Sequence, residues 1–421
     1  MPRRFTALAA ALLCASLCVA ARARASSAGD EVPAWLRQAA AVSVPAYDRK
    51  VSAVVLIDDE TVTVAPDGRI RTVTNYAVRV LTREGREEAA ARIGYRTGSD
   101  KVKEFRAWLL RPNGDAVKYG KDETADVAAL DNDVYDEHRA KLILAGRDAE
   151  PGTVFGYQAT TEERSPVSQL SRFFQRADLP VLVSRYALTL PTGWRSTSLV
   201  FNHPKVEPSV SGTTYTWELR NLPPVEPEPS GPTVSNLVPR LAVNYGPEAG
   251  TSTPGSGRVF NNWGDLSRWL TELHDPRAEP DDRIAVKARE LTANAKTEFE
   301  KIQAVARYAQ NIQYISVQIG IGSLQPHAAT EVFAKSYGDC KDKVTLMRAM
   351  LRALRMQSYS VAIYSGDPTF VREEWPGFQF NHAIIAVKVS DETKAPSVMQ
   401  HPTLGHLLFF DPTDTNVPVG D

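Results

Sequence analysis

The sequence is poor in cysteine. Only three of its 421 residues are cysteines, and two of them, Cys14 and Cys18, lie among the first 20 residues. Once that N-terminal segment is removed, Cys340 is the single cysteine and has no partner for a disulfide within the chain. A spare thiol is a liability in an oxidising compartment, so its retention there indicates a reactive residue.

The sequence also lacks a long hydrophobic run and a strong net charge. No stretch after the N-terminus approaches 18 apolar residues, so we expect no integral membrane segment in the mature chain. The formal net charge is -1 and there is no basic block, which gives no reason to expect a nucleic acid or an anionic membrane as a partner. The sequence does not indicate the oligomeric state.

Residues 1–25 have the features of a secretory signal peptide. Arg3-Arg4 forms a basic start, residues 7–21 are an apolar run, and Ala23-Arg24-Ala25 offers a cleavage site before Ser26. This segment carries four arginines and no acidic residue, so its removal takes the formal net charge from -1 to -5. We therefore predict export to the periplasm or the extracellular space. The sequence does not decide the export route.

The following part of the chain alternates between apolar and polar residues. After a lead at 26–50 with one short helix, the period of two predicts an all-β, sandwich-like domain at 51–222. Turn sequences such as Ala65-Pro66-Asp67-Gly68 separate the runs. The predicted strands are 51–57, 61–64, 71–81, 105–110, 116–119, 154–160, 185–190, 196–201 and 213–219. No ligand site is evident in this domain.

A segment rich in Pro, Gly and Ser, residues 223–258, predicts a linker between domains. Beyond it, helical periodicity comes first and strand periodicity second, which predicts an α+β domain over 259–421. The predicted helices are 263–273, 282–295, one that starts at the capping-box sequence 297–300, and 329–335, and the predicted strands are 312–317, 359–364, 380–389 and 407–410. We expect the loop at 390–405 to protrude.

Cys340 stands at the predicted start of another helix. Gly338-Asp339 predicts a turn and an N-cap before it. The apolar positions that follow recur at helical spacing: Val344, Met347, Leu351 and Leu354. In a first helical turn, unpaired backbone N–H groups and the positive end of the helix dipole favour a thiolate, the nucleophilic form. Lys341 and Lys343 add positive charge nearby.

A cysteine nucleophile needs a base, and the base needs an orienting partner. His382 lies near the start of a predicted apolar strand, and Asp411 follows another, where its carboxylate is placed to accept a hydrogen bond from an imidazole. Each residue alone has an ordinary structural explanation. Their order after Cys340, on a helix and then two strands, is a more specific pattern.

Other catalytic classes find less support. The sequence has no Gly-x-Ser-x-Gly motif for a serine hydrolase. Its histidines and its cysteine lack the spacing of zinc ligands, so we expect neither a metal nor another cofactor.

These residues resemble the transglutaminase-like superfamily, cysteine enzymes with a papain-like core. The match is to a bacterial secreted branch in which a β-rich domain of unknown function precedes that core. The motifs that carry the resemblance are Gln325-Pro326, Val332-Phe333, Tyr337-Gly338-Asp339-Cys340-Lys341-Asp342-Lys343, Phe380-Asn381-His382-Ala383 and Phe410-Asp411-Pro412-Thr413, with Arg111-Pro112-Asn113-Gly114 and Arg172-Phe173-Phe174-Gln175 in the N-terminal half. The resemblance implies that Cys340 is the nucleophile, His382 the general base and acid, and Asp411 the orienting carboxylate.

The implied activity is acyl transfer on peptide or amide bonds of a substrate in the cell envelope, through a thioester on Cys340. Hydrolysis is favoured over transamidation because water is the default acceptor. The Cys340 backbone N–H is a natural oxyanion donor, and Gln318 and Gln325 are candidates for a second donor. The alternative is a non-enzymatic cell-envelope binding module with an inert core. The sequence does not identify the substrate. Related proteins look longer, which suggests a truncation at the C-terminus, and the sequence does not decide this either.

Overall fold

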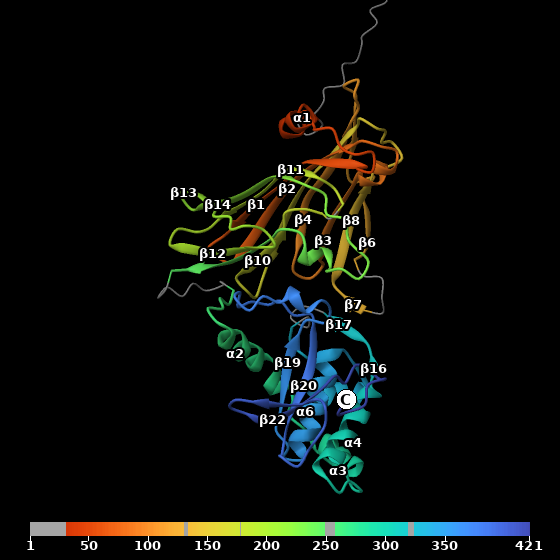
Figure 1. The fold of residues 1–421 in the computed structure, drawn as a ribbon, viewed down its shortest axis with the longest axis vertical. Coiled ribbons are helices and arrows are strands. Elements are labelled where there is room, and N and C mark those ends of the chain that lie inside the picture. The colour runs from red at the N-terminus through yellow and green to blue at the C-terminus, as the bar shows by residue number, and fades with distance from the viewer. Residues whose placement is uncertain (1–30, 130–133, 177, 249–256, 319–323) are drawn as a thin grey trace, which may run out of the picture.

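The computed structural model describes residues 31–129, 134–176, 178–248, 257–318 and 324–421. The predicted signal peptide lies outside these residues and stays a prediction. A β-rich region forms the upper half of the molecule in Figure 1, and a region of helices and strands forms the lower half. Among the described helices, none has the length and apolar character needed to cross a membrane.

The β-rich region begins with a short helix and continues as strands. Its elements are α1 (Ala34–Ala40), β1 (Ala53–Val64), β2 (Arg69–Val80), β3 (Ala90–Arg96), β4 (Lys101–Leu110), β5 (Ala116–Tyr119), β6 (Ala125–Ala128), β7 (Val134–Asp136), β8 (His138–Leu144), β9 (Val154–Arg164), β10 (Gln169–Phe173), β11 (Val181–Thr189), β12 (Trp194–Phe201), β13 (Ser209–Ser211), β14 (Thr214–Leu222) and β15 (Arg240–Pro247).

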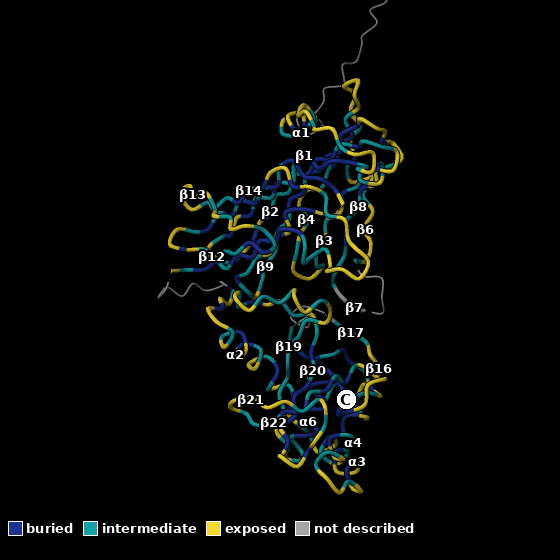
Figure 2. Tube along the Cα trace, in the orientation of Figure 1, coloured by how far each residue is buried: buried dark blue, intermediate teal, exposed yellow. Residues whose placement is uncertain are grey.

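One large sheet and two small sheets enclose the core of this region. The large sheet has eight strands in the order β13-β14-β11-β1-β2-β9-β4-β5, in which β1 and β11 run parallel. The small sheets are β10-β15-β12 and β3-β8-β6. Phe155 and Trp217 from the large sheet pack in one apolar cluster with Val243 and Ile143 from the small ones, where Figure 2 shows the trace as buried. The predicted sandwich-like all-β architecture is confirmed.

β1 is one continuous strand, where the sequence analysis predicted two strands separated at 58–60. The acidic run that interrupts the apolar alternation is neutralised by arginines from other strands. Arg185 of β11 binds Asp59 at 2.6 Å, and Arg172 of β10 binds the carboxylates on either side of it. The prediction was wrong here because these partners are more than 100 positions away in the chain.

The segment at 223–258, predicted as a linker, contains strand β15. This strand pairs with β10 and β12, so part of the segment belongs to the β-rich region. Its apolar residues Leu241 and Val243 are buried in the core of that region. The domain boundaries themselves stay a prediction.

The C-terminal region has the α+β composition that the sequence analysis predicted. Its elements are α2 (Trp263–His274), α3 (Asp282–Leu291), α4 (Glu298–Gln310), β16 (Gln313–Tyr314), β17 (Ser316–Gln318), α5 (Ala329–Lys335), β18 (Tyr337–Gly338), α6 (Cys340–Ala353), β19 (Ser358–Ile363), β20 (His382–Val389), β21 (Val398–His401) and β22 (Gly405–Phe410). The strand β21 lies in the predicted loop at 390–405 and pairs with β22, so this part of the segment is a strand and not a loop. The expected protrusion stays a prediction.

Helix α6 is the centre of the C-terminal region. Helices α3, α4 and α5 and strands β19 and β20 all pack against it. Residues 341–351 are buried in one unbroken run, including two lysines and an arginine. The burial of this helix therefore extends beyond the apolar stripe, because α6 is enclosed by neighbours. The strands pair in the order β19-β20-β22-β21.

Candidate active site

Cys340 is the first residue of α6, as predicted. Asp339 is the N-cap and accepts a hydrogen bond from the Asp342 backbone N–H, and the Asp342 carboxylate binds the Asp339 N–H in return. This reciprocal capping box fixes where the helix begins. Glycine is required at position 338, because a Cβ there would lie 2.5 Å from the Cβ of Asp342. The thiol of Cys340 is free and half-buried.

The two lysines that follow Cys340 in the first turn of α6 already have partners. Lys341 forms an ion pair with Asp339. Lys343 is 1% exposed, and its ammonium group donates to the backbone oxygens of Gln310 at 3.0 Å and Pro412 at 3.5 Å. Burial lowers the pKa of Lys343, and the nearby carboxylate of Asp411 opposes this effect. Lys343 therefore joins α6 to the turn that carries Asp411.

His382 and Asp411 meet where neighbouring strands β20 and β22 begin and end. His382 is the first residue of β20, and Asp411 directly follows β22. These two strands are antiparallel, which places the start of one beside the end of the other. His382 Nε2 lies 2.7 Å from Asp411 Oδ2. The other oxygen, Oδ1, accepts hydrogen bonds from the Thr413 backbone N–H at 2.8 Å and the Thr413 hydroxyl at 2.6 Å.

The side chain of His382 is also hydrogen-bonded to Cys340, so the structure brings the three predicted residues together. Nε2 is bound to Asp411, which leaves Nδ1 for the sulfur. The bond to Asp411 first, and the bond to Cys340 second, raise the pKa of His382 to about 10. Burial acts to raise the pKa of Asp411, but the bonds from His382 and Thr413 outweigh it and lower that pKa. The arrangement favours an imidazolium beside the sulfur at neutral pH.

Tyr314 is a further residue at this site, and the sequence analysis missed it. Its side chain hydrogen-bonds both the thiol and the backbone of Cys340. The pairing of β16 with β18, in register from Tyr314 to Gly338, holds it there. Tyr314 is half-exposed as a whole, and partial burial of its side chain is the first reason why its pKa lies above its usual value, followed by charge on Cys340 and Asp339. Tyr314 is therefore a neutral hydroxyl that can donate a hydrogen bond at the nucleophile.

For the two glutamines that were candidates for this role, the structure gives one side-chain contact and one backbone pairing. Gln325 accepts a hydrogen bond from Arg277 at 2.9 Å through its side-chain oxygen. Gln318 ends β17, where its backbone pairs with Asp136 of β7, and its side chain lies outside the described part of the structure. Both assignments stay predictions.

The β-rich region contacts the segment that leads into His382. Gln169 of β10 donates to the backbone oxygen of Pro376 at 3.0 Å and accepts from the backbone N–H of Phe378 at 3.0 Å. Arg240 of β15 donates to the Phe370 backbone oxygen at 3.1 Å and lies 4.0 Å from the centre of its ring. These contacts fix the path of the chain just before β20. Within the described ranges, no three His, Cys, Asp or Glu side chains gather in a way that could hold a metal ion.

Comparison with known proteins identifies both regions. Residues 286–392 match the family model described as "Transglutaminase-like superfamily". Residues 66–226 match the model described as "Domain of Unknown Function with solved-structure structure (DUF3857)". The resemblance predicted from the sequence motifs is thus confirmed. No curated protein matches the chain.

Of three solved structures that match the chain, one supports the fold. A "putative protease" from Parabacteroides distasonis ATCC 8503 is 16% identical with a TM-score of 0.65, covering 87% of this chain and 72% of that one. A "putative cysteine protease" from Cytophaga hutchinsonii is 12% identical over 83% of this chain and 79% of that one, but its TM-score is 0.23. The periplasmic domain of TgpA from Pseudomonas aeruginosa is 14% identical over 79% of this chain and 94% of that one, with a TM-score of 0.22. The last two values are too low for a structural argument.

Proposed function

Since the C-terminal region belongs to the transglutaminase-like superfamily, we propose that this protein is an exported cysteine enzyme that cleaves peptide or amide bonds in the cell envelope. The family match supports a cysteine-based enzyme in general terms. The observation that carries the more specific proposal is the hydrogen-bonded series from Cys340 through His382 to Asp411.

The first step is attack by the sulfur on a carbonyl carbon. The raised pKa of His382 keeps its ring protonated at neutral pH, and an imidazolium stabilises a thiolate beside it. The thiolate electron pair forms the S–C bond, and the carbonyl π pair moves to oxygen. In the free protein the Tyr314 hydroxyl is bound to the backbone of Cys340. The developing oxyanion replaces the hydroxyl oxygen as acceptor and receives both the Cys340 N–H and the Tyr314 O–H.

The second step is expulsion of the amine. The C–N bond breaks as His382 gives its proton to the leaving nitrogen, and a thioester on Cys340 remains. Water then attacks the thioester, His382 takes a proton from it, and the thiolate leaves with the S–C electron pair. Asp411 holds the ring of His382 in orientation throughout through the 2.7 Å bond. We favour water over an amine as the acyl acceptor, because no feature of the described residues marks a binding site for an accepting amine.

The test is alkylation of Cys340 by iodoacetamide as a function of pH, with the label located by mass spectrometry. We expect labelling to remain fast well below pH 8 in the wild-type protein and to slow there in His382→Ala, since an ordinary thiol has few thiolates at that pH. His406→Ala is the matched control, because His406 of β22 also binds a carboxylate at 2.7 Å, but its partner Asp391 is exposed.

Ordinary thiol behaviour in both wild type and His382→Ala contradicts the proposal and favours the alternative, a binding module with an inert core. Incubation with cell-envelope extract followed by mass spectrometry of Cys340 then identifies the acyl group. An adduct on Cys340 of the wild-type protein after a rapid acid quench, absent from Cys340→Ala, supports a thioester on this sulfur.

A further inference from the structure

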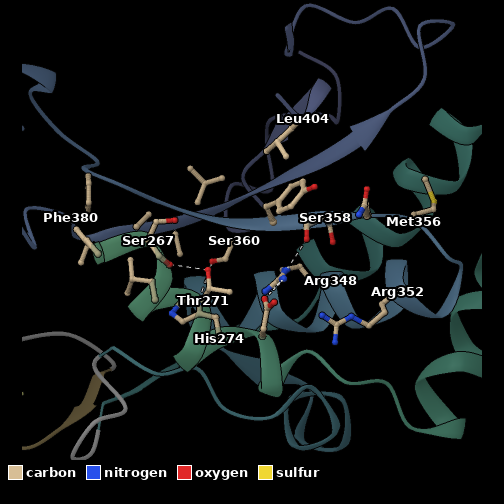
Figure 3. A pocket seen from close by; sticks show the side chains of 18 of the residues that line it. Ser267, Thr271, His274, Arg348, Arg352, Met356, Ser358, Ser360, Phe380 and Leu404 are labelled. Carbon is tan, nitrogen blue, oxygen red and sulfur yellow. Dashed lines mark hydrogen bonds and ion pairs between the residues drawn. The ribbon is translucent and has the colours of Figure 1, made fainter. Parts of the chain in front are cut away.

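A groove runs along β19 in the C-terminal region (Figure 3). Its volume is about 890 Å³. Residues 357–362 line it without a gap, and the facing wall is one side of α2, with Ser267, Thr271 and His274. None of the residues proposed for catalysis, Cys340, His382, Asp411 and Tyr314, lines this groove.

β19 is the outer strand of its sheet, since the order is β19-β20-β22-β21. The backbone of an outer strand directs alternate residues away from its neighbour. The Lys388 N–H donates to the Gln357 oxygen, so 357, 359 and 361 face β20 and the residues between them face outward. Arg348 confirms this, because it reaches the outward oxygen of Ser358 at 3.3 Å. Ser360 and Ala362 therefore present backbone N–H and C=O groups to the groove.

The wall opposite β19 is fixed in place. His274 lies 3.1 Å from the Ser360 hydroxyl through Nδ1 and 3.0 Å from the Leu324 backbone oxygen through Nε2. Arg348 binds Asp275, just beyond α2, at 2.6 Å. The separation of α2 from β19 is therefore set by buried polar contacts, and the groove is preformed.

The two ends of the groove differ in chemistry. One end reaches Phe380 and Ala383, which flank His382 in the chain, and Trp263 adds a second aromatic ring there. At the other end lie Arg352, which is paired with Glu279, and the exposed Arg355. An occupant with an apolar part near His382 and an acidic part away from it matches this polarity.

We propose that the groove binds an extended peptide segment of the substrate, which adds to β19 as a further strand. Strand addition uses backbone hydrogen bonds for affinity and side-chain pockets for specificity, and both are present along β19. The strand has 6 residues, which span about 20 Å at about 3.3 Å per residue. The proposal rests on the proposed function, in that it identifies the substrate as a polypeptide and places its chain beside His382.

The first test measures peptide binding to the full chain carrying Cys340→Ala, which cannot turn over its ligand. The probe is a mixture of ten-residue peptides with blocked termini, from which the tightest binder is sequenced and resynthesised with one N-methyl group at each position in turn. We expect the Kd to rise about tenfold at two positions that lie two residues apart and to change little at the others, because the Ser360 and Ala362 oxygens can accept from alternate amides of an added strand whereas Arg348 already binds the Ser358 oxygen. Equal losses at all positions, or no bound peptide, overturn the proposal.

The second test removes one donor from β19. Ala362→Pro lacks the outward N–H, and proline is tolerated on the outer side of an edge strand. Ala362→Gly keeps the N–H and is the matched control. We expect the Kd of the selected peptide to rise about tenfold in Ala362→Pro alone, with the unfolding midpoint of the two variants compared in parallel. Equal affinity in both variants contradicts strand addition.

Failure here is separable from failure of the proposed function. If N-methylation weakens peptide binding at alternate positions while Cys340 reacts as an ordinary thiol, strand addition to β19 is supported and the proposed enzyme activity is rejected. Fast alkylation of Cys340 without peptide binding retains the enzyme and rejects the groove. An acidic residue at the distal end of the selected peptide, with affinity lost in Arg355→Glu, supports the predicted polarity.

Discussion

Each region of the molecule buries more than one cation, and two of them, Arg172 and Lys343, have partners of different kinds. In the β-rich region the side chain of Arg172 is 7% exposed and binds two carboxylates of β1, Asp58 at 2.8 Å and Glu60 at 3.1 Å. In the C-terminal region Lys343 is 1% exposed and donates to the backbone oxygens of Gln310 and Pro412.

The difference shows what each cation does. Arg172 neutralises acids that would otherwise interrupt β1, so it ties one sheet of the sandwich to the other. Lys343 neutralises no acid directly, and instead fixes the turn after β22 from which Asp411 reaches His382. A buried charge therefore stabilises strand pairing in one region and positions a proposed catalytic carboxylate in the other.

Removal of the Asp411 charge is expected to have the largest effect. In Asp411→Asn the bond to His382 no longer carries a charge, so the pKa of His382 falls and the preferred tautomer is lost. We expect kcat to fall about 10⁴-fold, as when the orienting carboxylate of a catalytic triad is made neutral. The measurement is peptide hydrolysis with the pH profile of Cys340 alkylation in parallel. A kcat within tenfold of wild type contradicts the role of Asp411.

Paired substitutions of the two buried cations test the comparison directly. Arg172→Met leaves two half-buried carboxylates without this partner, and Lys343→Met leaves two carbonyls without a donor. We therefore expect each substitution to lower the free energy of unfolding by about 3 kcal/mol. Urea unfolding measures this loss. Only Lys343→Met should also lower kcat and shift the pH profile of alkylation, because only Lys343 contacts the turn that holds Asp411.

Equal kinetic effects of the two variants would mean that general destabilisation explains both. Lys343→Arg keeps a donor at this position and should recover part of the kcat if positioning is the cause.

Loss of the Tyr314 hydroxyl is expected to have a smaller effect on the reaction. Tyr314→Phe removes one donor to the oxyanion, for which a fall in kcat of about 10²-fold is typical. Tyr95→Phe is the matched control in the β-rich region, where the hydroxyl binds Asp126 at 2.7 Å. We expect Tyr95→Phe to leave kcat unchanged. If the two variants have the same kcat, Tyr314 does not stabilise the oxyanion.

Local signals in the sequence predicted much of the C-terminal site. Gly338 and Asp339 marked the start of α6, and alternation marked β20. The approach of His382 and Asp411 followed from their places at a strand start and a strand end. Tyr314 could not be predicted in this way, because its role depends on the pairing of two strands of two residues each, too short to carry a period.

The β-rich region shows the same limit in its strand pairing. β4 and β5 were both predicted as strands, and they pair across a turn that is local in sequence. The continuity of β1 was missed because Arg172 and Arg185 neutralise its acids from distant strands. β15 was missed because Pro, Gly and Ser around it outweighed its short apolar alternation, which is buried only through pairing with β10 and β12.

The smallest expected difference between the two regions is in how their stability depends on pH. One titrating group in each region is compared, and their contributions to the free energy of unfolding change with pH in opposite directions. The pKa of His382 is raised from 6.5 to about 10, so its contribution is complete below pH 6.5 and is lost as the pH rises toward 10. The bond from Tyr95, followed by those from Lys141 and Arg139, lowers the pKa of Asp126 below 3.8, so its contribution is present above pH 3.8 and is lost in acid.

Urea midpoints measured from pH 3 to pH 10 in wild type, His382→Ala and Asp126→Asn test these signs. We expect His382→Ala to flatten the alkaline side of the curve and Asp126→Asn to flatten the acid side. The acid effect should be the smaller one, since Asp126 lies at the surface, where solvent screens its partners. An alkaline slope that is the same in His382→Ala and wild type would mean that the imidazolium is not stabilised by folding, which removes the basis for a thiolate beside it.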